Sequence, residues 1–358
     1  MIKPEPALVR EIDEQRPRVG AGLLSKQEKD TLIERGIVGL YRWYLARSQA
    51  TRNWNPDKGF NWRALRTDHS AQLNHIVEGF FAVEQFVPDY TVQTINISRT
   101  SHGRAHFQIR WGSEEEKHSD LWLNTMLFLR HRSLGWLKEY QAALYAKRYE
   151  MPWDDAYHMG FYALVQERAT QLNYLNTMQV ANGKSDNPEL AGDVDPVLAE
   201  VSHTIAVDEA AHYNFFLEIT RLLLYYYPAR TLEGLHDVIQ RFAMPALDLI
   251  PNAGQFYDAV YRAGIYTTRQ YSRDVLQVVF DHLGIAGRRA LADGVKRLRQ
   301  APDEDGNLRD TAIFDTLDYD GLEDAIKRLY RRVGDHEAEF GLADIDPTTF
   351  VPSGLAPV

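Results

Sequence analysis

The sequence of 358 residues contains no cysteine, which excludes disulfides, thiolate metal sites and cysteine nucleophiles. Any bound metal must therefore sit on histidine, aspartate and glutamate side chains. The sequence also lacks an apolar run of about 18 or more residues, so we expect no membrane span. Its N-terminal stretch, MIKPEPALVREIDEQRPRVG, is charged throughout and has no apolar centre, unlike a secretory signal. These absences favour a soluble, cytoplasmic protein.

Basic residues are outnumbered, with 40 Lys and Arg against 50 Asp and Glu, and the formal net charge is -10. A chain of this charge is a poor partner for nucleic acid, so we expect none. No glycine-rich nucleotide-binding fingerprint is evident either, so redox chemistry would need a separate reductase.

Strand-like alternation is scarce, and helical spacing of apolar residues dominates the chain. Helices are predicted near residues 26–50, 66–87, 108–148, 154–181, 196–227, 231–245, 254–264, 268–284, 286–300 and 320–334. The segment 91–97 fits either a short strand or an extension of the preceding helix. The expected fold is all-α, a ferritin-like four-helix bundle core with additional surrounding helices.

We expect a single domain over residues 1–358, with the metal-binding bundle core at about 66–228. The segment 1–25 is expected to be irregular, and the Pro- and Gly-containing segment 344–358 is expected to be an extended tail.

Two Glu-x-x-His pairs stand out, because residues three positions apart lie on the same face of a helix. Glu115 and His118 form the first pair, in WGSEEEKHSDLW, and Glu209 and His212 form the second, in TIAVDEAAHYNFF. Each pair is spaced to bind one metal centre.

The motif occurs twice more, as Glu200–His203 and Glu233–His236, so its spacing alone does not identify a site. Glu200 lies nine positions before Glu209, on roughly the opposite face of the helix, and the later pair has the more apolar surroundings. Glu233 follows a Pro-Ala-Arg-Thr turn, where the helix dipole by itself favours an acidic residue. For both extra pairs we prefer an ordinary structural role.

Two single glutamates complete the pattern, Glu84 in an apolar helical stripe and Glu167 in FYALVQERATQLNY. Burying four carboxylates costs several kcal/mol each unless something compensates, and two ferrous ions would neutralise all four. Oxygen-rich sites with one histidine per metal suit iron or manganese better than zinc. The order Glu, Glu-x-x-His, Glu, Glu-x-x-His on four helices matches the ferritin-like di-iron carboxylate proteins, which predicts two iron ions per subunit.

On these motifs the sequence resembles the plant and bacterial acyl-acyl-carrier-protein (acyl-ACP) desaturases over roughly residues 35–290. The most specific element is Gln166-Glu167-Arg168-Ala169-Thr170, which matches that family's QERAT motif. The other similar segments are Trp111 with Glu114-Glu115-x-x-His118, Asp208-Glu209-x-x-His212, Glu84 before Pro88, Met244-Pro245-Ala246, and Trp54-Asn55-Pro56 with Phe60. Residues 171–173 differ from the plant version, and the gap between Glu84 and Glu115 is shorter, so chain length and double-bond position stay open.

The resemblance implies that the iron ligands are Glu84, Glu115, His118, Glu167, Glu209 and His212. It also implies that Thr170 lies beside the oxygen-binding face, that Asp208 orients a ligand histidine, and that Asp208 and Trp54 form an electron route from the surface. Without the resemblance, Trp54 is simply a core aromatic residue and Asp208 a solvated helix residue. The implied reaction is O2-dependent formation of a cis double bond in an acyl chain on acyl carrier protein. Ferredoxin or a similar donor would supply electrons, and the enzyme would be a homodimer.

Other functions would use the same ligands. A related di-iron hydroxylase or N-oxygenase is the nearest alternative, and the QERAT motif argues against it. A ribonucleotide reductase small subunit is disfavoured because no tyrosine follows His118 within two turns. A non-catalytic ferritin-like iron-binding protein, including a relative that kept the metal but lost desaturation, is a further alternative.

Overall fold

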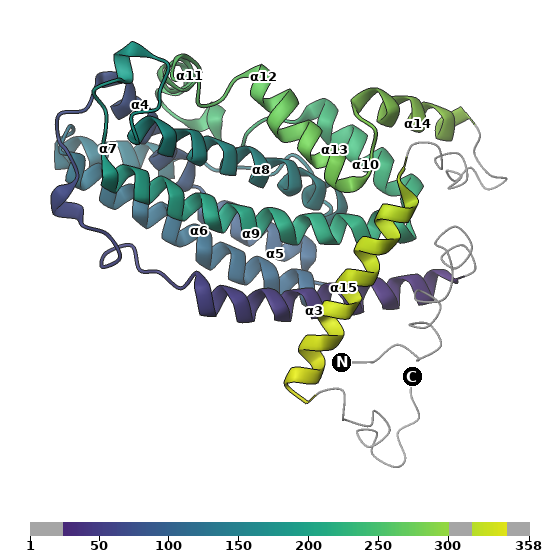
Figure 1. Cartoon of the computed structure of the whole chain (residues 1–358). Helices are drawn as coiled ribbons and strands as arrows, with labels where there is room; N and C mark the ends of the chain where they lie inside the picture. Colours follow the sequence, from purple (N-terminus) through teal and green to yellow (C-terminus); the bar gives the residue numbers. More distant parts are fainter. Residues whose placement is uncertain (1–23, 301–316, 342–358) are drawn as a thin grey trace.

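The computed structural model describes residues 24–300 and 317–341, and within these residues it contains helices but no β-strand (Figure 1). Four helices form the core. They are α4 (Ala71–Glu84), α6 (His102–Leu129), α8 (Ala156–Ala181) and α9 (Pro196–Tyr226). The predicted all-α bundle is therefore confirmed.

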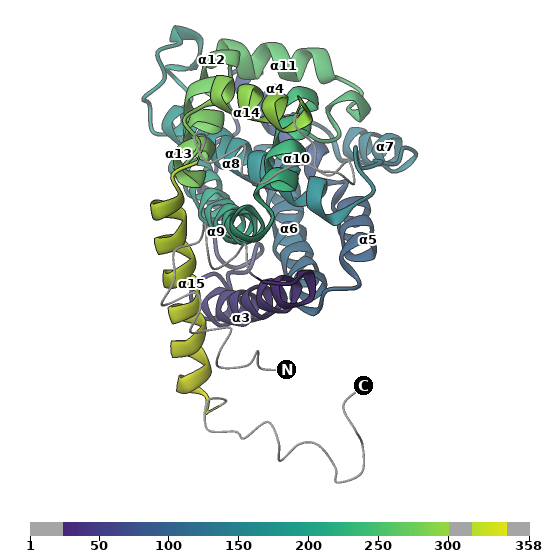
Figure 2. The same cartoon turned by 90° about the vertical axis from the view of Figure 1, so that its right-hand side faces the viewer.

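Helix α9 lies at the centre of the molecule. Figure 2 looks along it and shows neighbouring helices on every side, and α9 packs against α3 (Lys26–Thr51), α6, α8, α10 (Pro228–Arg241), α13 (Gln277–Leu283) and α15 (Tyr319–Glu339). Most of its side chains are buried, among them the large Phe215 and Leu222. Acidic side chains on such a helix face the protein interior unless they lie on its few exposed positions.

The remaining helices cover the core. α5 (Val87–Ser98) packs on α6, α11 (Ala253–Arg262) packs on α4, and α14 (Arg288–Gln300) packs on α10. Helix α15 crosses α3 at the edge of the molecule (Figure 1). The other elements are α7 (Leu134–Tyr145), α12 (Thr268–Gln270), a π-helical turn (Tyr271–Leu276) and short 3₁₀ turns at Trp62–Ala64, Pro188–Leu190 and Leu247–Leu249.

Aspartate caps set where the two central helices begin. The Asp195 carboxylate accepts from the N–H groups of Val197 and Leu198, and Pro196 occupies the first helical position of α9. Asp155 caps α8 in the same way. Both arrangements satisfy N–H groups that have no partner within the helix, and they fix the start of the helices that carry half of the candidate ligands.

Several predicted boundaries were wrong, most notably in three segments. The helix expected at 66–87 begins at Ala71, because Ser70 caps it and a 3₁₀ turn precedes it. The helix expected at 108–148 is two helices, separated where Arg130 adopts a left-handed conformation with φ 56°. The segment 91–97 belongs to α5, a separate helix rather than a strand or a continuation of α4. The expected irregular segment 1–25 and tail 344–358 lie outside the described residues, except for residues 24 and 25.

None of the helices that the structure describes is both long and apolar enough to cross a membrane.

Gly103 allows the start of α6 to approach the backbone of α3 closely. A Cβ added at Gly103 would lie 2.8 Å from both the Ile37 carbonyl carbon and the Val38 nitrogen. We expect Gly103→Ala to lower the free energy of unfolding by about 1–3 kcal/mol, because the added methyl group would clash with backbone atoms of α3, which cannot move aside as a flexible side chain can. Gly334→Ala, in the open surroundings of α15, should be neutral or slightly stabilising. Urea denaturation of the two variants measures both effects, and equal stability would contradict the packing described.

Candidate metal centre and adjoining cavity

The structure brings six predicted ligands together from the four core helices. Glu84 ends α4, Glu115 and His118 come from α6, Glu167 comes from α8, and Glu209 and His212 come from α9. All six are buried. Their ligating atoms form two groups, each with all atoms within 4.8 Å of one another: Glu84, Glu115, His118 and Glu209, and Glu115, Glu167, Glu209 and His212. Glu115 and Glu209 belong to both groups, as expected of carboxylates that bridge two ions.

Several atoms in this cluster are buried without a hydrogen-bond partner, which is costly unless something else binds them. They are Glu115 Oε1, Glu167 Oε2, Glu209 Oε2, His118 Nδ1 and His212 Nδ1. A protein interior rarely collects five unsatisfied polar atoms at one point, and metal coordination would satisfy all of them. The donor set, four carboxylates and two imidazoles, fits a pair of iron or manganese ions.

Each candidate histidine is held by a carboxylate outside the cluster. His118 Nε2 lies 3.3 Å from Asp208 Oδ2, and His212 Nε2 lies 3.0 Å from Glu114 Oε2. A ligand histidine commonly donates its second N–H to a carboxylate in this way, which fixes its tautomer and turns the other nitrogen toward the metal. In both residues that nitrogen is Nδ1.

Glu114 is a residue that the sequence analysis did not assign. It is fully buried, and beside His212 its carboxylate accepts from the hydroxyls of Tyr44 and Ser48 on α3 and from Arg110 at 3.2 Å. Burial by itself would raise the pKa of Glu114, but the bonds from His212 and the hydroxyls lower it well below its usual range. Glu114 therefore stays ionised and anchors His212.

Asp208 occupies the matching position beside His118. Its Oδ2 accepts from Trp54 Nε1 at 3.0 Å, and its Oδ1 lies 3.3 Å from Arg52 Nε. The Trp54 ring is stacked on the His118 ring, with 6.1 Å between centroids and 6° between planes. The three predicted partners Trp54, Asp208 and His118 thus form one continuous contact, while their roles remain a prediction.

Two further side chains bond to the candidate ligands. Tyr174 donates its hydroxyl to Glu84 Oε1 at 2.5 Å, and Trp111 donates its indole N–H to Glu167 Oε1 at 3.0 Å. Both were missed as site residues, although helical spacing offered a signal. Tyr174 lies two turns after Glu167 on α8, and Trp111 lies one turn before Glu115 on α6.

Burial and the charges of neighbouring side chains raise the pKa values of some groups in the cluster and lower those of others. Burial and the neighbouring Glu115 raise the pKa of Glu84 to about 8, and burial and the same neighbour raise the pKa of Glu209 well above its usual value. Burial would lower the pKa of His118, but Glu115 and Asp208 raise it to about 10. Burial would raise the pKa of Glu115, but the two histidines lower it to about 2. Without metal, the cluster therefore retains protons that a cation would displace.

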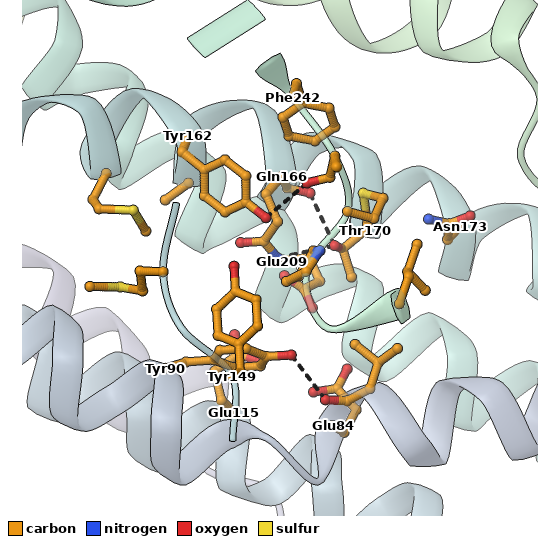
Figure 3. A pocket seen from close by; sticks show the side chains of 18 of the residues that line it. Glu84, Tyr90, Glu115, Tyr149, Tyr162, Gln166, Thr170, Asn173, Glu209 and Phe242 are labelled. Carbon is orange, nitrogen blue, oxygen red and sulfur yellow. Dashed lines mark hydrogen bonds between the residues drawn. The ribbon is translucent and has the colours of Figure 1, made fainter. Parts of the chain in front are cut away.

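A cavity of about 770 Å³ adjoins the cluster, and Glu84, Glu115 and Glu209 form part of its wall. In Figure 3, Glu84 and Glu115 lie across the cavity from Tyr162 and Phe242. Most of the lining is apolar, with Phe80, Phe215, Phe216, Met159, Ile219 and Met244 among the contributors. The ligand atoms thus open onto an apolar space large enough for a hydrocarbon chain.

Thr170 and Gln166 line the same cavity. Thr170 Oγ1 donates to the Gln166 carbonyl at 3.0 Å and accepts from Gln166 Nε2 at 3.1 Å. Thr170 therefore lies at the cavity, one turn after Glu167 on α8. Its part in oxygen chemistry remains a prediction.

The two extra Glu-x-x-His pairs lie outside the metal-ligating groups. Glu200 and His203 are exposed on α9, and Glu233 and His236 are half-buried on α10.

Comparison with known proteins gives one family. The sequence profile described as fatty acid desaturase matches residues 74–302. A stearoyl-[acyl-carrier-protein] 9-desaturase of Arabidopsis thaliana is 28% identical over 258 residues, which cover 64% of this chain and 63% of the relative. An acyl-[acyl-carrier-protein] desaturase of Oryza sativa is 27% identical over 198 residues, covering 53% of this chain and 46% of the relative. The chain thus aligns with less than two thirds of the length of these relatives. A solved R2-like ligand-binding oxidase overlays on it only loosely, with a TM-score of 0.36 at 13% identity over 82% of this chain and 92% of the oxidase.

Proposed function

We propose, from the premise that this chain belongs to the fatty acid desaturase family, that it is an O2-dependent di-iron desaturase. Its substrate would be an acyl chain carried on acyl carrier protein, its product a cis double bond, and its electrons would come from ferredoxin or a similar donor. The observation that carries the proposal is the cluster of six candidate ligands opening onto an apolar cavity of about 770 Å³. The two relatives described above are desaturases of chains on acyl carrier protein, which supports the carrier and the reaction.

The ligand set assigns the metals as follows. Glu84 and His118 would hold one iron ion, Glu167 and His212 the other, and Glu115 and Glu209 would be shared between them. When bound, the iron pair would supply the oxidising power: dioxygen, two electrons from the donor, two protons and two hydrogens from neighbouring carbons of the chain would give the double bond and two water molecules.

The protein's own side chains position the substrate and exclude water. Apolar side chains of the cavity hold the hydrocarbon beside Glu84, Glu115 and Glu209. They also exclude water from these candidate ligands. Thr170 is the hydroxyl closest in sequence to the Glu167 ligand on this wall, and its bonds to Gln166 fix its orientation. We further propose that the chain is a single domain that acts as a homodimer, which light scattering of the purified protein would test.

Asp208 is proposed to position His118. We expect Asp208→Asn to weaken iron binding at the His118 position by about 10–100-fold, because an amide cannot hold the imidazole tautomer as a carboxylate does. Competition with a ferrous chelator measures the affinity. Asp120→Asn, an exposed change on α6, is the control. Equal affinities in the two variants would contradict the positioning role.

Trp54 is proposed to carry electrons to the site through Asp208. Trp54→Phe keeps an aromatic ring but removes the N–H that bonds Asp208. We expect unchanged iron content and slower reduction of the oxidised centre by ferredoxin in stopped-flow measurements. Reduction at the wild-type rate would exclude this route.

The reaction itself is tested by loading the protein with ferrous iron and supplying ferredoxin, its reductase, NADPH and a panel of acyl-ACPs. Mass spectrometry of the released chains should show a loss of two hydrogens. A gain of one oxygen atom would instead identify a hydroxylase with the same metal site. An unchanged panel at full iron load would refute the acyl-ACP assignment.

A further inference from the structure

One face of α6 runs along the cavity from the candidate ligands to an arginine. Arg104, Gln108, Trp111 and Glu115 all line the cavity. Their spacing of four, three and four positions keeps them on one face of the helix. Eleven positions separate Arg104 from Glu115, which places Arg104 about 16 Å along the helix axis from the candidate metal centre.

Arg104, which is itself half-buried, lies at the end of the cavity away from α11, which we call the inner end. At the outer end the lining includes Tyr257 and Tyr261, which are 52% and 64% exposed. Around Arg104 the lining comes from the end of α5 and the starts of α6 and α8, and Ser98 and Met159 there are 5% and 7% exposed. A chain that enters beside α11 and passes the ligands would therefore end near Arg104.

Among residues 24–297 and 317–341, no carboxylate forms an ion pair with Arg104 at this end, and its Nε is buried without a hydrogen-bond partner. Burial lowers the pKa of Arg104, as expected for a cation that is poorly compensated. The nearby carboxylate of Glu34 raises the pKa of Arg104 by charge attraction, but it accepts its hydrogen bonds from the Ser101 hydroxyl at 2.8 Å and the Gly103 N–H at 3.4 Å.

The surroundings of Arg104 add positive charge and hydrogen-bonding capacity. Its guanidinium lies over the Tyr157 ring at 5.2 Å, and that of Arg230 lies over the same ring at 3.9 Å. Gln108, one turn further along α6, is 7% exposed, and its buried Oε1 has no partner. Because the oxygen and nitrogen of an amide are interchangeable by a flip, this side chain is able to donate into the cavity as well as accept.

We propose that the inner end of the cavity binds a carboxylate, held by Arg104 and Gln108, so that the preferred substrate is a hydrocarbon chain with an anionic inner end. The proposal rests on the acyl-chain reaction proposed above and narrows its substrate class. A carboxylate matches the fork of a guanidinium with two parallel bonds and would neutralise its charge, which a methyl terminus cannot do.

This carboxylate has two chemical sources. A free fatty acid would enter with its carboxylate first. A dicarboxylic chain would enter with its far carboxylate first while its other end stays attached to the carrier as a thioester. In both cases the same group meets Arg104, and the substrate panel below separates them.

Binding to the full-length, metal-free protein tests the inference without any contribution from iron. Isothermal titration would compare dodecanoate with dodecanol, which has the same chain without the charge. We expect the wild type to bind dodecanoate at least about tenfold more tightly, the usual effect of a buried hydrogen bond to a charged group. Arg104→Met should abolish this preference and Arg104→Lys should keep part of it. Arg99→Met, an exposed change at the end of α5, should leave it intact.

Equal affinities of the wild type for acid and alcohol would overturn the inference. A preference that survives in Arg104→Met would also overturn it. Melting curves show whether each variant is folded. If Arg104→Met does not fold, the preference of Arg104→Lys for the acid over the alcohol is compared with that of the wild type instead.

Turnover by the iron-loaded protein then identifies the source. The panel is dodecanoate, dodecanoyl-ACP and the ACP half-thioester of dodecanedioic acid. Preferential oxidation of free dodecanoate, or of the dicarboxylic thioester, supports the inference and selects the source. Oxidation of dodecanoyl-ACP at least as fast as the dicarboxylic thioester, and equally fast in Arg104→Met, overturns it. If no chain is oxidised, the proposed function fails, and the binding preference alone decides the inference.

Discussion

Glu209→Gln should remove most of the bound iron and abolish oxidation of the acyl chain. Glu209 is 1% exposed and belongs to both groups of candidate ligands, so its loss affects both ions at once. Changes to groups that only orient a metal ligand cost about 10–100-fold in affinity, and removal of a shared ligand should exceed that. Iron per chain after desalting, measured by a chelator assay, provides the readout.

The same substitution should stabilise the metal-free protein at alkaline pH. Burial and the neighbouring carboxylates raise the pKa of Glu209, which shows that its ionised form is unfavourable where it lies. An amide of the same shape has no such cost. Glu200→Gln, an exposed change on the same helix, should alter neither iron content nor stability. Full iron loading of Glu209→Gln would show that Glu209 is not a shared ligand.

The metal-free wild type should lose stability as the pH rises from about 5 to about 8. A carboxyl whose pKa is raised in the folded protein keeps its proton where the unfolded chain has released it, so folding is penalised increasingly above the unfolded value. Glu84, with a pKa raised from 4.5 to about 8, and Glu209 both act in this direction. His118, raised from 6.5 to about 10, adds to the loss above the unfolded value. Each such group lowers the free energy of unfolding by about 1.4 kcal/mol per pH unit.

Glu115 does not oppose this trend within that range. Its pKa is lowered to about 2, so its stabilising contribution is complete above its unfolded value of 4.5 and is lost only in acid. Ferrous iron, added without oxygen, should reverse the slope, because metal binding displaces the retained protons more readily as the pH rises. The gap in melting temperature between iron-loaded and metal-free protein should therefore widen from pH 5 to 8. A constant gap would mean that the cluster does not bind the metal through these groups.

Four of the candidate ligands are marked in the sequence by local spacing, and the single Glu84 and Glu167 are marked by an apolar helical stripe and the QERAT motif. Glu115 with His118, and Glu209 with His212, are readable on a single helix, and the structure places both pairs on buried faces. The all-α fold followed equally from the helical spacing of apolar residues. Spacing in the sequence identifies residues that share one face of a helix, and the candidate ligands lie on such faces.

The supporting side chains could not be read in the same way. Glu114 adjoins Glu115 in sequence but points toward α3, where Tyr44 and Ser48 lie about seventy positions earlier in the chain. No periodicity connects residues on helices that meet only through tertiary packing. The break at Arg130 was hidden for a related reason, since its left-handed conformation lets Arg132 reach the buried Glu78 on α4, a contact across 54 positions.

The most direct test of the two-metal site combines metal analysis with Mössbauer spectroscopy of protein loaded with ⁵⁷Fe. The six-ligand cluster should bind two ferrous ions per chain, and after exposure to oxygen these should give the spectrum of a magnetically coupled ferric pair. Binding of a single ion, or of two ions without magnetic coupling, would contradict a shared site in which Glu115 and Glu209 bridge both metals.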